Sequence, residues 1–107
     1  MKLAARIHVL AGPFASQQLA YAHLLDVAQD HALSPDFDHV EVVTGPPLPR
    51  LRGYFDDAVA ADLARAAGGD VLVLVLPGAL VTGRFPETAH LRDLGVHQGH
   101  VTRAALQ

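Results

Sequence analysis

Short apolar runs in this chain alternate with longer stretches in which apolar residues recur every three or four positions. The first apolar run, residues 5–11, includes the β-branched residues Ile7 and Val9 and ends at Gly12-Pro13. Apolar β-branched residues followed by Gly-Pro are typical of a strand that ends in a turn. The pattern therefore predicts a first strand over these residues.

A helix is predicted from Gln17 to about Ala32. Ser16 can accept a backbone N–H bond as its N-cap, and Phe14, just before the cap, can pack back on the first turns. The apolar face of this helix is predicted to carry Ala20, Leu24, Val27, Ala28 and His31. The opposite, polar face is predicted to carry His23, Asp26 and Asp30.

In the middle of the chain, a strand is predicted over residues 39–44. Gly45–Pro49 follows and is predicted to be a stiff, extended connection because it holds three prolines. Asp56 or Asp57 is predicted to cap a second helix that runs to Ala67 and ends at Gly68-Gly69. The run Val71–Leu76 has no polar residue, so it predicts a central strand covered on both faces.

The last third of the chain is less regular. Residues 79–82 are predicted either to pair back as a hairpin or to continue irregularly. Residues 86–90 predict one helical turn with Pro86 at its first position, and residues 91–101 a last short strand. The order β-α-β-α-β-(β)-β predicts a single α/β or α+β domain over residues 1–107. We expect two layers, a small mixed sheet of four or five strands and two main helices.

Composition excludes several kinds of chemistry. The 107 residues include no Cys, so disulfides, thiolate nucleophiles and Cys-ligated metals are ruled out. Lys2 is the only lysine, no glycine-rich phosphate loop is present, and the two serines lie outside any G-x-S-x-G motif. We therefore expect no cofactor. No apolar stretch approaches the roughly 18 residues of a membrane helix, and the expected location is the cytoplasm.

Charge is unevenly distributed although the net charge is only −3. No Lys or Arg lies between Ile7 and Pro49, whereas that window holds Asp26, Asp30, Asp36, Asp38 and Glu41. The chain has no basic stripe, which argues against nucleic-acid binding. An acidic surface suits a basic protein partner, so these five acids are the candidate partner-binding residues. The same residues would also be expected on an ordinary solvated surface.

Histidine is the one abundant side chain with catalytic or metal-binding chemistry. His90, His97 and His100 are weak candidates for a metal site, since the chain contains no H-E-x-x-H or comparable spacing. His8 alternates with Ile7 and Val9 and is predicted on an exposed strand face. A small histidine-dependent enzyme or ligand-binding domain is therefore the alternative function. It requires a pocket where two of these four histidines meet an acid.

The stretch Leu10–Ser16 resembles the aromatic-x-Gly-x-Phe-x-Ser motif of a family of small bacterial immunity proteins from polymorphic toxin systems, with Leu10 at the aromatic position. Residues 34–38, 70–75 and 91–96 are similar to later landmarks of that family. The resemblance implies a protein that binds and neutralises a cognate toxin without catalysis. A homodimer is also compatible with such a small apolar chain.

A second resemblance covers only the first part of the chain. The order strand, Gly-Pro-Phe, Ser and helix in residues 8–18 is similar to the start of SPOR-type peptidoglycan-binding domains. Peptidoglycan binding is therefore the third hypothesis, and it leaves the strand at Val71–Leu76 without a counterpart.

Overall fold

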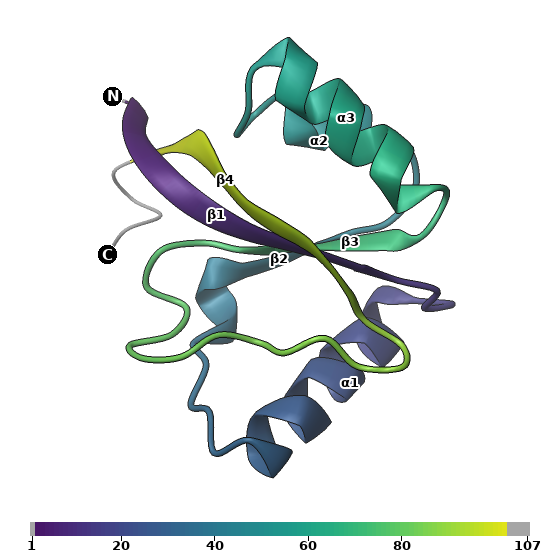
Figure 1. The fold of residues 1–107 in the computed structure, drawn as a ribbon, viewed down its shortest axis with the longest axis vertical. Helices are drawn as coiled ribbons and strands as arrows, with labels where there is room; N and C mark the ends of the chain where they lie inside the picture. The colour runs from purple at the N-terminus through teal and green to yellow at the C-terminus, as the bar shows by residue number, and fades with distance from the viewer. Residues whose placement is uncertain (1, 103–107) are drawn as a thin grey trace.

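The computed structural model describes residues 2–102, with the side chain of residue 102 excepted. Its elements, in chain order, are β1 (Lys2–Gly12), α1 (Gln17–Asp30), the single 3-10 turn η1 (Phe37–His39), β2 (Val40–Val43), α2 (Leu48–Leu51), α3 (Asp57–Ala67), β3 (Val71–Val75) and β4 (Arg92–Thr102). The chain is a small α+β domain, as the sequence predicted (Figure 1).

The four strands form one sheet in the order β2-β3-β1-β4. Each neighbouring pair is antiparallel, so the predicted mixed sheet is wrong in this detail. The reason lies in the link from β2 to β3. The chain leaves the sheet after β2, passes through α2 and α3, and re-enters at the same end, so β3 runs opposite to its neighbour β2.

The two main helices lie on opposite faces of the sheet, so the domain has three layers rather than the predicted two (Figure 1). Ile7, Val9 and Leu74 belong to the core under α3, whereas Leu10 and Val73 belong to the core over α1. Consecutive apolar residues in a strand point to both faces, and each face then needs cover. The prediction that residues 71–76 form a central strand is confirmed, since β3 lies between β2 and β1 and is buried throughout.

The helix ends follow the predicted capping residues. The Ser16 hydroxyl accepts the Leu19 N–H at 3.2 Å, and the Asp56 carboxylate accepts the Val59 N–H at 3.0 Å. Gly68 ends α3 with φ 58°, in the left-handed region that favours glycine. Helix α1 ends at Asp30, earlier than predicted, and His31 is consequently exposed instead of lying on the buried face.

Two loop predictions are wrong. Instead of continuing an extended connection, Leu48 and Pro49 begin the short helix α2, and Pro47 is its N-cap. Proline is tolerated there because the N–H groups of the first helical turn have no intrahelical partner. Residues 86–90 form no helical turn; Thr88 instead pairs with Leu91 in an isolated antiparallel bridge. Residues 79–82 take the irregular course rather than a hairpin.

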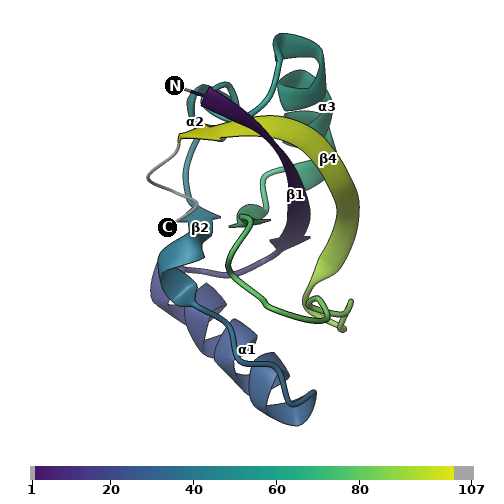
Figure 2. The ribbon, with the colours of Figure 1, turned by 90° about the vertical axis from the view of Figure 1, so that its left-hand side faces the viewer.

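Strands β1 and β4 form a long curved ribbon that extends beyond the rest of the sheet (Figure 2). Strand β3 pairs only with residues 8–12 of β1, so the first half of β1 has β4 as its one partner strand. Near the middle of the ribbon, His8 pairs with Val96 but Leu10 with Asp93, so β4 holds one extra residue there. At the far end, the His100 N–H donates to the Tyr54 carbonyl at 2.6 Å and attaches the edge of β4 to the α2–α3 connection.

Within residues 2–102, every helix is too short or too polar to cross a membrane.

Candidate functional site

Four of the five predicted partner-binding acids lie on the exposed surface. Asp26 and Asp30 are exposed on α1, and Asp36 and Asp38 are exposed at η1, which follows α1 in the chain. Asp36 also has a local role, because its carboxylate accepts the Asp38 N–H at 3.0 Å. Among the described residues, Asp26, Asp30 and Asp38 have no cation within ion-pair distance.

Glu41, the fifth acid, lies apart from the other four. It is in β2 between Val40 and Val42, which belong to the core on the α1 side, so its side chain lies on the opposite face of the sheet. Its Oε1 lies 3.0 Å from Arg50 Nε in an ion pair, and its side chain is only 21 % exposed. The structure therefore separates Glu41 from the acids of α1 and η1.

Helix α1 also exposes large apolar side chains, which the sequence reasoning missed. Leu19 and Leu25 are 55 % and 47 % exposed, while the buried face of the helix is formed by other residues. We call the exposed residues Leu19, Ala22, Leu25, Asp26 and Asp30 the α1 surface. The signal was present in the sequence, because Leu19 and Leu25 fall outside the predicted buried positions of the helix.

A small groove lies next to the C-terminal end of α1. It has a volume of about 110 Å³ and is lined by Ala32, Leu33, Ser34, Leu80, Val81 and Thr82. Val81 in its wall is 97 % exposed. The Asp36 N–H donates to the Ala79 carbonyl at 2.7 Å and links the two segments that form the groove.

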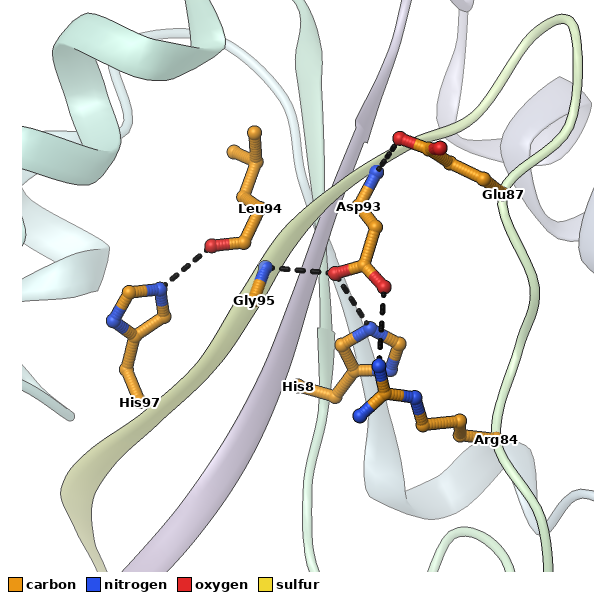
Figure 3. Close-up of polar contacts among 7 residues, drawn as sticks. All are labelled: His8, Arg84, Glu87, Asp93, Leu94, Gly95 and His97. Atoms are coloured by element: carbon orange, nitrogen blue, oxygen red, sulfur yellow. Dashed lines mark hydrogen bonds and ion pairs between the residues drawn. The ribbon is translucent and has the colours of Figure 1, made fainter.

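His8 is buried, contrary to the prediction that it lies on an exposed strand face. It is only 6 % exposed, and its Nε2 lies 3.0 Å from Asp93 Oδ1 (Figure 3). The long loop between β3 and β4 also reaches the pair, since Arg84 of that loop lies 3.6 Å from Asp93 Oδ2. Glu87 of the same loop accepts the Asp93 N–H at 3.0 Å.

The Asp93 carboxylate is held in its charged form. Burial raises its pKa, but the Gly95 N–H at 2.7 Å, the His8 ring and the Arg84 guanidinium together lower it more, so the pKa of Asp93 lies below its usual value. His8 Nδ1 is buried and has no hydrogen-bond partner in the structure. The pair orients the His8 ring and joins β1 to β4, at the point where Arg84 brings the β3–β4 loop against Asp93.

The three candidate metal ligands lie in different surroundings. The His90 ring packs edge-on against His23 at 5.8 Å. His97 Nε2 bonds the Leu94 carbonyl at 2.7 Å, and His100 is exposed on β4. Residues 2–102 contain no group of three His, Asp or Glu side chains placed to hold a metal ion.

Two larger pockets meet at Arg50. One, of about 480 Å³, lies along β2 and is lined by Gln17, Val42, Val43, Thr44, Pro46, Pro49 and Arg50. The other, of about 310 Å³, lies at the end of the β1–β4 ribbon and is lined by Lys2, Pro49, Arg50, Gly53, Tyr54, His100 and Val101. Neither is lined by His8 or Asp93, so the Asp–His pair and these pockets are separate features.

Comparison of the chain with protein-family models, with curated proteins and with solved structures finds no match in any of the three.

Proposed function

We propose that this protein acts by binding a basic protein partner through the α1 surface and the adjoining acids of η1, and that the partner is a toxin that it neutralises without catalysis. The observation that carries the proposal is the α1 surface itself, where two exposed leucines lie beside unpaired aspartates. The toxin-inhibitor class comes from the motif resemblance of Leu10–Ser16 described above.

The exposed leucines support binding because each offers apolar area on a regular helix that a partner can cover. Leu19 and Leu25 together with Val81 offer apolar area that a partner can bury, at about 25 cal/mol for each Å² removed from water. Apolar anchors surrounded by polar groups are the common arrangement of residues that dominate binding energy.

The charge of this surface supports a basic partner. Residues 7–49 contain no Lys or Arg, so the α1 surface has a single sign of charge over its whole length. Unpaired surface carboxylates accelerate encounter with a basic partner and disfavour acidic ones. Asp26 and Asp30 are four residues apart on one face of α1, next to Leu25, so charge and apolar contacts would act together.

The test is capture of a partner from the protein's own cell lysate by the tagged chain, compared with a charge-reversed variant Asp26→Lys/Asp30→Lys. The matched control is Asp57→Lys/Asp62→Lys, which reverses two exposed acids on α3 on the other face of the sheet. We expect one stoichiometric partner that the α1 variant loses and the α3 variant keeps. When expressed alone, that partner should arrest cell growth. Co-expression of the wild-type chain should restore growth, and co-expression of the α1 variant should not.

Two results would count against the proposal. Either no stoichiometric protein is retained, or the two variants lose the partner equally, in which case the α1 surface contributes nothing specific. If a partner is captured but is harmless when expressed, the binding proposal stands and the toxin-inhibitor class is wrong.

A further inference from the structure

The end of the molecule formed by the β1–β4 ribbon carries unpaired positive charge. Lys2 and Arg6 are exposed on β1 and have no carboxylate within ion-pair distance among the described residues. Each of the other described cations, all arginines, has an acidic partner: Arg50, Arg52, Arg65, Arg84 and Arg92. The ribbon end is therefore the part of the described surface where cations are available to a ligand.

The pocket of about 310 Å³ at this end brings side-chain nitrogen donors together from three elements. Lys2 comes from the start of β1, Arg50 from α2 and His100 from β4, and among the described residues no Asp or Glu lines the pocket. The bond from the His100 N–H to the Tyr54 carbonyl at 2.6 Å fixes β4 against the α2–α3 connection, so the walls are held in place by the fold.

Arg50 is oriented for this role by Glu41. Arg50 Nε and Glu41 Oε1 form an ion pair at 3.0 Å. A guanidinium held through Nε can present its terminal N–H groups to an oxyanion in the paired geometry that arginine forms with phosphate.

Tyr54 adds a neutral polar group to the same wall. Burial, a hydrogen bond with the Glu41 side chain and the charge of that carboxylate raise the pKa of the Tyr54 hydroxyl to about 12. The hydroxyl consequently stays protonated at neutral pH and adds no negative charge to the pocket.

We propose that this pocket binds a small phosphate-bearing anion, with Lys2, Arg50 and His100 on the phosphate oxygens. Pro49, Gly53 and Val101 form the remaining wall, and their apolar surface suits the organic part of a phosphomonoester. This site lies on the ribbon and α2, away from the α1 surface, and does not depend on the proposed partner binding.

The experiment is an NMR titration of the full chain with inorganic phosphate, against chloride at equal ionic strength. Lys2→Gln is compared with the control Arg6→Gln, which also removes one positive charge. Arg6 lies outside the pocket, four residues or about 13 Å further along β1. Both positions are exposed on the ribbon, so both variants should fold, as their amide spectra will show.

Saturable shifts of the Gly53, Tyr54 and His100 amides with phosphate, and not with chloride, are the expected result. Lys2→Gln should weaken phosphate binding about fivefold, and Arg6→Gln less than about twofold, because a charge-assisted hydrogen bond outweighs a screened distant charge. Phenyl phosphate, which adds an apolar group, should bind more tightly than inorganic phosphate. The proposal is overturned if phosphate and chloride give the same shifts, or if the two variants weaken binding equally.

Discussion

Replacement of Asp93 by Asn tests whether the buried pair of His8 and Asp93 serves the stability of the fold. Asn has the shape of Asp, but no charge, and one of its two terminal atoms is a donor. The substitution therefore keeps the packing and removes the charge that faces His8, Arg84 and the Gly95 amide.

The size of the effect follows from the contacts of Asp93. Its carboxylate accepts bonds from the Gly95 N–H at 2.7 Å and from His8 at 3.0 Å, and a hydrogen bond to a charged group contributes about 1.5–3 kcal/mol against about 1 kcal/mol for a neutral one. Arg84 is 62 % exposed, so its ion pair adds little. We expect Asp93→Asn to lower the free energy of unfolding by about 1–3 kcal/mol at pH 7.

The stability lost on Asp93→Asn substitution should become smaller as the pH falls. The pKa of Asp93 is lowered in the folded protein, so its charge stabilises the fold fully above the ordinary value of 3.8 for the unfolded chain. That contribution disappears as the pH falls through the lower, folded pKa. Wild type and variant should therefore begin to converge below about pH 4 and should meet below the folded pKa of Asp93.

Urea unfolding of both proteins at several pH values measures this difference directly. Asp62→Asn is the control, because Asp62 pairs with Arg65 on the exposed side of α3, and its loss should cost less than about 1 kcal/mol. The role assigned to this carboxylate would be refuted by equal free energies of unfolding for wild type and Asp93→Asn at pH 7. A difference in that free energy that stays constant as the pH falls into the acid range would refute it as well.

Substitutions at two further positions test the local structure. Ser16→Ala should lower the free energy of unfolding by about 1 kcal/mol, because it removes the N-cap of α1, and Ser16→Asn should restore most of it; urea unfolding measures both. Gly99→Ala should cost about 1–3 kcal/mol in the same assay, since its new Cβ would overlap the Tyr54 carbonyl oxygen and press on Phe55. An unchanged stability of Gly99→Ala would mean that the α2–α3 connection does not pack tightly on β4.

The sequence predicted the elements with strong local signals. Ser16, Asp56 and Gly68 mark helix ends by chemistry that acts within a few residues, and the uninterrupted apolar run of β3 requires cover on both faces. Layering and strand direction were not predicted correctly. Both depend on where α2 and α3 return the chain to the sheet. The proline-rich link was predicted to be extended, but its second half forms the helix α2.

The candidate sites show the same limit. The exposure of Asp26 and Asp30 followed from helical periodicity, but the separation of Glu41 required knowledge of which face of β2 packs against Arg50. The pairing of His8 with Asp93 joins residues 85 positions apart and depends on an extra residue in β4, which no local pattern of the sequence specifies. The phosphate pocket likewise combines residues from both ends of the chain.

The central claim, that the α1 surface binds a protein partner, is tested most directly by amide hydrogen exchange of the chain alone and with the captured partner. We expect slower exchange over residues 19–30 and 80–82 in the complex, with α3 unchanged. Protection confined to α3 or to the β1–β4 ribbon, or no protection anywhere, would contradict it.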